Sequence, residues 1–479
     1  MARLPGPRLW EQGVWGLRIR RRPVETFVAM HERFGPVFAT GIRPFKFVFL
    51  IGPDVHRELF VDIERFAWRE VTKPVMVVDG ETALVVSDGD DHERRRRIVQ
   101  PAFNIRRIER HIPLMVEEAQ RTLRAWTVGA DVNVYEELRR CIRRIVIRAL
   151  FGDRLSDRAD ELGDRLQPAL DFVDRPLPQV KINLPGTPWH RARVGRRHTD
   201  ELVFAEIQAR RQAGVDGEAE DVISWLLAAS DPEGDGAQLT DQEVRDQVVS
   251  LIAAGYETTS AAVGWTLWAA LANPGVWERL RAEVGDEPTT PERLRTLTYL
   301  NGVVSESLRL WPPGAVAGRK LLEPIDAAGV RIPAGVIALY SPFVTQRLPE
   351  LWPDPLTFRP ERWDKNDPSY VEPAPLSYLP FGAGPRRCIG FAFALAEIKV
   401  LLAEVVRAAD LDLLTRHEPS PQSVASMRPK GGVSVRVKGL RSVLAVESRP
   451  TGGLGQPVTA TSPTLEVERA RRPRLAVRE

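Results

Sequence analysis

A cysteine within a glycine-rich segment is the residue of this chain with the clearest chemical potential. Residues 380–390 read PFGAGPRRCIG, and a helical pattern follows them. A thiol where a loop turns into a helix gains backbone N–H groups and the positive helix end, and Arg386 and Arg387 add charge. We therefore expect a lowered pKa for the thiol of Cys388. The glycines let the backbone approach a flat, bulky ligand, which favours a functional thiolate over a small packing residue.

A carboxylate and a hydroxyl stand side by side in an apolar helical stretch. They are Glu257 and Thr258, within the sequence AGYETT at residues 254–259. Buried polar groups in mid-helix are costly unless they have partners, so the pair indicates a working polar site. Gly255 weakens the helix and Thr258 can bond a backbone carbonyl, which together permit a kink. An acid beside an alcohol suits proton transfer; a satisfied helix bulge is the alternative.

Two further patterns place charged side chains on single helix faces. Glu306 and Arg309 are three residues apart and can pair, although such pairs are mostly surface features. A proline-rich segment with the sequence FRPERW at residues 358–363 follows them. His92 and Arg96 are four residues apart, so both can project towards one anion.

Together, in this order, these motifs resemble those of the cytochrome P450 family, over roughly residues 25–440. Residues 381–390 match the haem-binding loop of that family at its key positions. The resemblance implies haem b as cofactor and Cys388 as the thiolate ligand of the iron. It also implies that Arg386 pairs with a haem propionate and that Phe381 packs near the sulfur.

The same resemblance assigns roles to the other motifs. Glu257 and Thr258 would deliver protons for O–O bond cleavage, and Glu306, Arg309 and Arg362 would form a buried structural triad. Further haem contacts would come from His92, Arg96, Arg319, Gly384, Gly390, Ala254 and Gly255. Two positions depart from the usual pattern. Trp363 stands where many members have Phe, and Gln346 where members often have His, so no role is assigned to Gln346.

The implied reaction is insertion of one oxygen atom of O2 into a small lipophilic substrate. No Walker loop or Rossmann fingerprint is present, so electrons would come from a separate donor, a ferredoxin with its ferredoxin reductase. The basic Arg386–Arg387 side of the loop is a candidate docking face. A peroxide-driven or isomerising enzyme, and a non-catalytic haem-thiolate sensor, remain alternatives. Family position places the substrate pocket at residues 75–86, 171–185, 253–254, 314–317 and 424–429.

Composition narrows the class of protein. The 479 residues are 43% hydrophobic and 27% charged with a net charge of +3, as in a soluble globular protein without nucleic-acid partners. The two cysteines favour a reducing, cytoplasmic location. No signal peptide opens the chain, which argues against an integral membrane anchor. Residues 248–271 could also be a membrane span, but Glu257 in their middle favours a helix through a protein core.

The elements that position these motifs follow from periodicity and proline. We expect a mainly α fold with a small β region: a hairpin at 36–40 and 45–51, mostly helices from 89 to 273, a helix at 291–310, strand pattern at 330–341, an irregular meander at 348–380, a helix at 388–409 and a strand at 433–437. The predicted domains are an N-terminal arm (1–24), one catalytic domain (25–440) and a tail (441–479), disordered from 449.

Overall fold

The computed structural model of the chain describes residues 4–41, 46–174, 181–214, 221–231, 233–234 and 236–441. They belong to one compact unit, Met1–Leu444, whereas a second unit, Ala445–Glu479, lies outside the described residues. We expected disorder for residues 449–479, and these residues lie outside the part of the chain that the structure describes. The predicted domain limits stay predictions.

Helices predominate and strands are short, which confirms the predicted mainly α class with a small β region. The α-helices are α1 (Gln12–Arg21), α2 (Pro23–Phe34), α3 (Pro53–Phe60), α4 (Arg69–Thr72), α5 (Met76–Asp79), α6 (Gly89–Val99), α7 (Ile105–Arg124), α8 (Val134–Phe151), α9 (Ala159–Val173), α10 (Pro188–Ala213), α11 (Val222–Ala228), α12 (Asp241–Ala272), α13 (Val276–Val284), α14 (Pro291–Thr296), α15 (Thr298–Leu310), α16 (Pro342–Thr345) and α17 (Phe391–Ala408). The strands are β1 (Val37–Thr40), β2 (Phe47–Leu50), β3 (Phe66–Ala67), β4 (Asp131–Asn133), β5 (Ala317–Leu321), β6 (Ile325–Ala327), β7 (Val330–Ile332), β8 (Ile337–Tyr340), β9 (Ala409–Leu413), β10 (Pro421–Gln422), β11 (Arg428–Pro429) and β12 (Ser434–Leu440).

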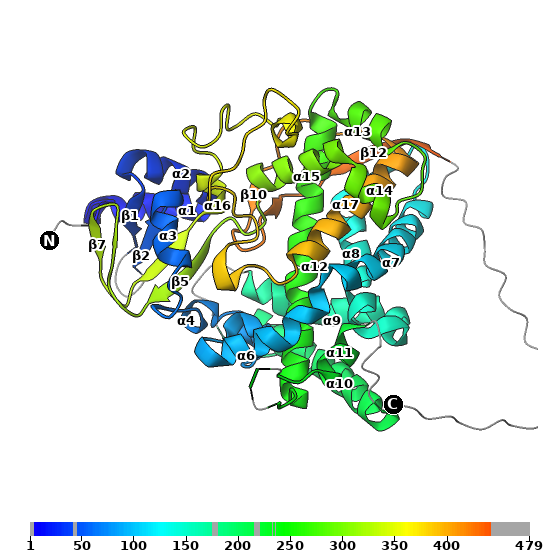
Figure 1. The fold of residues 1–479 in the computed structure, drawn as a ribbon, viewed down its shortest axis with the longest axis horizontal. Coiled ribbons are helices and arrows are strands. Elements are labelled where there is room, and N and C mark those ends of the chain that lie inside the picture. The colour runs from blue at the N-terminus through cyan, green and yellow to red at the C-terminus, as the bar shows by residue number, and fades with distance from the viewer. Residues whose placement is uncertain are drawn as a thin grey trace, which may run out of the picture. The chain divides into compact units, whose positions relative to one another are not determined.

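The larger sheet has the strand order β1-β2-β8-β5-β3. β1 and β2 form the predicted antiparallel hairpin, with Val37 opposite Leu50. β8 runs parallel to β2, and β5 runs antiparallel to β8, with Arg319 opposite Ala338. The strand predicted at 433–437 lies in β12, which pairs with β4 and β9. Figure 1 shows the larger sheet and the first helices on one side and most other helices on the opposite side.

α12 runs through the helical part of the unit and carries Glu257 and Thr258 (Figure 1). It begins with a capping box in which Thr240 and Glu243 satisfy each other's backbone N–H groups. It packs against α8, α15 and α17, and side chains around its circumference, Trp265 among them, are buried. A helix that is apolar on all sides belongs inside a core. Among the helices that the structure describes, none has the length and apolarity needed to cross a bilayer.

Two predicted helix limits were wrong. The helix expected at 291–310 is divided into α14 and α15 at Leu297, because Glu283 accepts the N–H groups of Tyr299 and Leu300 and starts a new helix there. The helix expected from Cys388 begins at Phe391, after a 3-10 turn at Gly384–Arg386. Cys388 therefore lies in the loop itself.

Candidate active site

The loop that carries Cys388 is closed by backbone contacts. The Cys388 N–H group donates to the Phe381 carbonyl at 2.9 Å, and the Phe381 ring meets the Phe391 ring edge-on with centroids 6.3 Å apart. Gly384 has a φ of +66°, and a Cβ there would lie 2.7 Å from the Phe60 carbonyl oxygen. Only glycine fits such a position. The loop therefore holds the cysteine at a defined place in front of α17.

The environment of the sulfur does not produce the lowered thiol pKa that the sequence predicts for Cys388. Cys388 is exposed at the edge of a cavity, and partial desolvation by the protein groups near its sulfur raises the pKa of its thiol. The Gly390 N–H group, Arg96 and Arg387 act in the opposite direction. The predicted lowering was wrong for the protein alone, because desolvation of the thiolate outweighs the stabilisation from these groups. A metal ion bonded to the sulfur would supply the missing positive charge.

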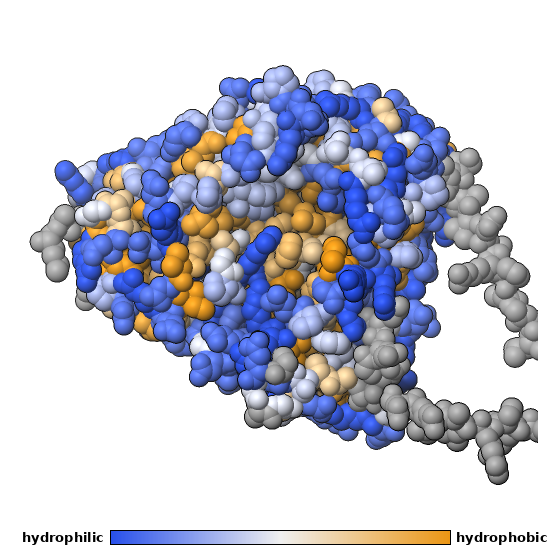
Figure 2. Space-filling view, in the orientation of Figure 1, coloured by the Kyte–Doolittle hydropathy of each residue, from blue (hydrophilic) through white to orange (hydrophobic). Residues whose placement is uncertain are grey.

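A cavity of about 790 Å³ lies beside the cysteine. α6, the 3-10 turn that follows it and the cysteine loop supply the wall, through residues that include His92, Arg96, Phe103, Cys388 and Phe391. On the face of the protein that Figure 2 shows, apolar side chains gather in the middle, with hydrophilic residues around them. The cysteine thus borders a cavity with charged and apolar walls.

Four basic side chains from α6, β5 and the cysteine loop lie close enough to influence one another. They are His92, Arg96, Arg319 and Arg386, and we call them the basic group. Burial, and then Arg386 and Arg96, lower the pKa of His92 to about 3. Burial also lowers the pKa of Arg386 to about 10, with a further contribution from Arg319. Within the described ranges, the one ion pair of this group joins Arg386 to Asp88 at 3.2 Å. The positive charge of Arg96 and Arg319, which no ion pair within these ranges compensates, suits an anionic ligand.

Arg319 is held in an aromatic cage. Its side chain is buried, donates to the Leu59 carbonyl, and has four rings around its guanidinium at 4.8–5.6 Å, those of Phe60, Phe66, Trp68 and Tyr340. Arg386 lies 4.1 Å from the same Trp68 ring. Trp68 therefore orients two of the basic groups. The sequence carried no signal for this role, because Trp68 lies about 250 residues before Arg319.

These residues fit the haem that the resemblance implies. Three buried nitrogens in the basic group, His92 Nδ1, Arg319 Nε and Arg386 Nε, have no hydrogen-bond partner in the described part of the chain. Gly390 has an ordinary φ of −87°, and an added Cβ would meet no protein atom within 4 Å. Nothing in the chain itself explains glycine there, whereas close approach of a flat cofactor does. The thiol, the free donors and the glycine together suit a haem with two carboxylates.

The acid and the alcohol of α12 point to different partners. Thr258 donates to the Ala254 carbonyl at 2.7 Å. The Glu257 carboxylate lies 2.5 Å from Arg139 of α8 and accepts from Gln167 of α9 at 3.4 Å. The two side chains share no hydrogen bond in the part of the chain that the structure describes. Gly255 has the Val146 side chain 3.4 Å from where its Cβ would stand, so this stretch of α12 packs closely on α8.

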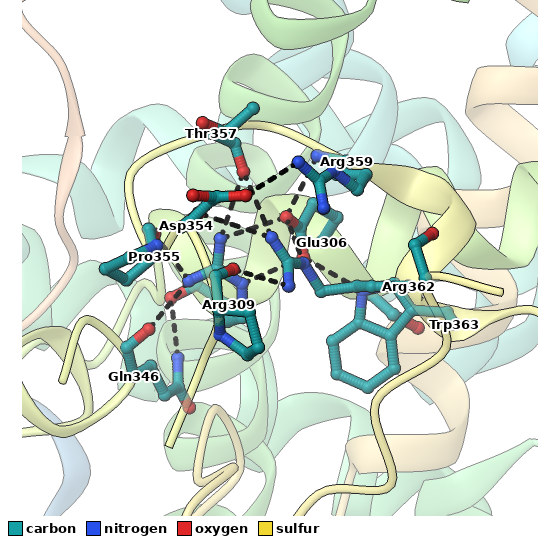
Figure 3. A network of polar contacts seen from close by, with 12 residues as sticks. Glu306, Arg309, Gln346, Asp354, Pro355, Thr357, Arg359, Arg362 and Trp363 are labelled. Carbon is teal, nitrogen blue, oxygen red and sulfur yellow. Dashed lines mark hydrogen bonds and ion pairs between the residues drawn. The ribbon is translucent and has the colours of Figure 1, made fainter. Parts of the chain in front are cut away.

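The structure brings Glu306, Arg309 and Arg362 together (Figure 3). Arg309 binds both carboxylate oxygens of Glu306 at 2.8 and 2.9 Å, and Arg362 binds one of them at 2.9 Å. All three side chains are buried. Because a buried charge is stable only with such complete pairing, this cluster ties α15 to the meander.

Two positions that depart from the family pattern take part in the same cluster (Figure 3). The Trp363 indole N–H donates to Glu306 at 3.0 Å, which a Phe could not do. The Gln346 amide group donates to the Leu308 and Arg309 carbonyls, and its oxygen accepts the Leu379 N–H at 2.7 Å. Gln346 thus connects the end of α15 to the start of the cysteine loop, a role that sequence reasoning missed.

A buried acid on α17 was also missed. Glu397 is inaccessible to solvent, and neither of its carboxylate oxygens has a hydrogen-bond partner within the described residues. Burial raises its pKa well above the ordinary value, an effect that nearby Thr259 of α12 opposes. Burial therefore favours the protonated, neutral form of this carboxyl group. A single acid early in an apolar helix was the available signal.

Comparisons with known proteins agree over nearly the whole chain. The sequence profile of the family described as Cytochrome P450 matches residues 4–436. A Mycobacterium tuberculosis protein named cytochrome P450 139 is 39% identical over 425 residues, which are 86% of this chain and 97% of that protein. Cyclooctatin synthase from Streptomyces melanosporofaciens is 31% identical and covers 89% of this chain and 96% of its own length.

A solved structure extends this similarity to the fold. A cyanobacterial CYP120A1 with bound retinoic acid superimposes with a TM-score of 0.77 at 28% identity, over 85% of this chain and 92% of its own. The family match spans every motif described above, from the basic residues of α6 to the cysteine loop. The chain therefore belongs to the cytochrome P450 family, whose members carry haem with a cysteine thiolate ligand, and it is a monooxygenase of that family.

Proposed function

We propose that this enzyme inserts one oxygen atom of O2 into a lipophilic organic substrate and receives its electrons from a separate redox protein. The observation that carries the proposal is the combination of Cys388 in its closed loop with the acid and the alcohol of α12. Bound haem, proposed here to be haem b, would supply the oxygen-activating chemistry. Cys388 would hold the iron, and His92, Arg96, Arg319 and Arg386 would hold the two propionates.

The remaining residues of the site would manage protons. Thr258 can exchange its hydrogen bond to the Ala254 carbonyl for one to a reacting oxygen. Glu257 is held by Arg139, and it can pass a proton inward only after leaving that ion pair. A relay through these side chains would use general acid catalysis, which typically contributes 10²- to 10⁴-fold. The acid and alcohol therefore favour oxygen activation over the peroxide-driven and sensor alternatives.

Relatives support a lipophilic substrate. One relative, 32% identical over 397 residues, is named cyclooctat-9-en-7-ol 5-monooxygenase, and the superimposed cyanobacterial structure binds retinoic acid. The segments proposed from family position to line the pocket are residues 75–86, 171–185, 253–254, 314–317 and 424–429, of which 175–180 lie outside the described residues. Difference spectra with fatty acids, sterols, terpenoids and macrolides would identify the substrate class.

A ferredoxin with its reductase is the proposed electron donor. Arg387 is exposed beside Cys388, with its guanidinium 3.9 Å from the Phe391 ring, and suits contact with an acidic partner. Arg386, which the sequence placed on the same docking face, has only 9% of its side chain exposed and faces Asp88 and Trp68. The docking proposal therefore rests on Arg387. The cytoplasmic location stays a prediction.

Replacing Thr258 by Ala tests the proposed function. The variant should continue to consume O2 and reducing equivalents, but release peroxide and form little product, because proton delivery fails. Thr266→Ala is a matched control, since Thr266 makes the same 2.7 Å bond to the carbonyl four residues earlier on α12. A wild-type ratio of product to O2 in Thr258→Ala would contradict the proposed relay. Absence of turnover in both the wild type and the variant would indicate a sensor.

A further inference from the structure

The N-terminal helix presents apolar side chains to solvent. Leu9, Trp10, Val14 and Leu17 are 77%, 74%, 62% and 51% exposed; we call these four residues the outer stripe. Val14 and Leu17 are three residues apart and lie along one side of α1, and Leu9 and Trp10 precede them in the 3-10 turn Leu9–Glu11. On the opposite side, Trp15 is buried in a cluster with Phe27 and Met30. α1 is therefore docked on the protein by one face and apolar on the other.

Polar groups do not interrupt the outer stripe. Gly13 and Gly16 are exposed beside it, and a Cβ at either position would meet no atom within 4 Å. The one acid between residues 9 and 22 is Glu11, which is buried, bonds the Arg8 N–H and pairs with Arg33 at 2.6 Å. An approaching flat surface would thus meet apolar side chains and glycine backbone.

Four arginines surround the end of the outer stripe. Arg18, Arg20, Arg21 and Arg22 are all exposed, and none forms an ion pair within the residues that the structure describes. Arg18 stacks on Trp15 at 4.8 Å. Glu25 is the one acid that shares a groove with Arg18, Arg21 and Arg22. Many other clustered arginines of this chain, such as Arg94 and Arg95 with Glu243, are paired, whereas these four are not paired within the described ranges.

We propose that the outer stripe and the four arginines bind the surface of an anionic lipid bilayer, with α1 lying parallel to it. Exposed Trp, Val and Leu side chains with arginines at their edge resemble the pattern of interfacial membrane binding. Anionic headgroups would pair with the arginines, and Trp10 would sit at the headgroup level, where tryptophan is favoured. A second copy of the chain fits less well, because two such arginine clusters would repel each other.

Co-sedimentation of the haem-loaded full chain with vesicles tests this proposal. Binding should occur with vesicles that contain phosphatidylglycerol and be weak with phosphatidylcholine alone. It should fall steeply at about 1 M salt, where the Debye length shrinks to about 3 Å. Because the readout is binding and not turnover, its failure is separate from failure of the proposed oxygenase reaction.

Two variants and two matched controls assign the binding to α1. The triple change Arg20→Gln, Arg21→Gln and Arg22→Gln should weaken binding about a hundredfold, at about fivefold per arginine. Removing three exposed arginines of α10, Arg191, Arg193 and Arg197, by the same change should have a far smaller effect. Trp10→Ser with Leu17→Ser should weaken binding at least about tenfold, whereas Val61→Ser, at an equally exposed valine, should not.

The outcomes show whether a lipid surface or a second copy of the chain covers the outer stripe. An unchanged ferrous–CO spectrum shows that each variant is folded and holds haem. Wild-type binding by the α1 variants, or equal binding to both kinds of vesicle, would overturn the proposal. So would an oligomer in the absence of lipid that Trp10→Ser converts to monomer, since a second copy would then cover the outer stripe.

Discussion

At the scale of single residues, hydrogen-bond donors concentrate on one buried carboxylate, that of Glu306. Glu306 receives two bonds from Arg309 and one each from Arg362, the Arg359 N–H and the Trp363 indole. Such saturation is what a buried carboxylate requires. By contrast, the basic group near Cys388 has donors left over. The first set stabilises the fold, and the second is available to a cofactor.

Trp363→Phe tests the indole contact to Glu306. Loss of a hydrogen bond to a charged group should lower the free energy of unfolding by about 1.5–3 kcal/mol, measured by denaturant titration. Trp268→Phe is a suitable control, because Trp268 also lies among aromatic rings but its N–H has no partner in the described structure. Equal losses in the two variants would show that ring size, and not the Glu306 bond, sets the cost.

Arg319→Met tests the predicted propionate contact. The methionine should fill the aromatic cage, so the protein should fold, but haem should transfer to apomyoglobin about tenfold faster or more, since a charged hydrogen bond is lost. Arg347→Met is the control, because Arg347 is a half-buried arginine that also lies over a ring, 3.5 Å from that of Phe343. Haem loss at the wild-type rate in Arg319→Met would remove Arg319 from the haem site.

At the scale of elements, α12 organises what surrounds it. Its Arg245 side chain donates to the Val78 and Asp79 carbonyls of α5, and its Ser250 hydroxyl donates to the Asp79 carboxylate at 2.9 Å. Asp246 accepts from the backbone and hydroxyl of Thr82. One helix thus fixes the segment at residues 75–86 that the family resemblance places over the substrate.

The pH dependence of stability should reveal the contact between α5 and α12. Burial raises the pKa of Asp79 to about 7, which Ser250 and Arg245 only partly oppose. Between about pH 4 and pH 7 the unfolded chain is ionised at this position while the folded chain keeps its proton, so stability falls as pH rises. Asp79→Asn should abolish this fall, up to about 4 kcal/mol.

Thermal or denaturant unfolding across this pH range provides the measurement. The variant should gain stability relative to the wild type at pH 8 and lose that advantage at pH 4. Asp90→Asn, at an exposed aspartate of α6, serves as control. Parallel pH profiles of Asp79→Asn and the wild type would contradict the assignment.

At the scale of the described unit, the sequence predicted those features that are set by the spacing of residues within a single segment. The cysteine loop, the acid–alcohol pair and the hairpin all lie within a few residues of their own signals. Apart from the contact of Arg362 with Glu306, which the family resemblance implied, contacts across the fold were not predictable, because packing decides which distant residues meet. Arg139 with Glu257, Trp68 with Arg319 and Gln346 with Leu379 belong to this kind. The division between α14 and α15 also depends on a contact from outside, through Glu283.

The central claim is that Cys388 supplies the thiolate ligand of the haem iron. The ferrous–CO absorbance spectrum of the holoprotein reports the axial ligand directly. Wild type should give a thiolate-type spectrum, and Cys388→Ser should lose it. Cys141→Ser should keep it, because Cys141 is the other cysteine of the chain and lies buried in the core of α8. A thiolate-type spectrum that persists in Cys388→Ser would contradict the account.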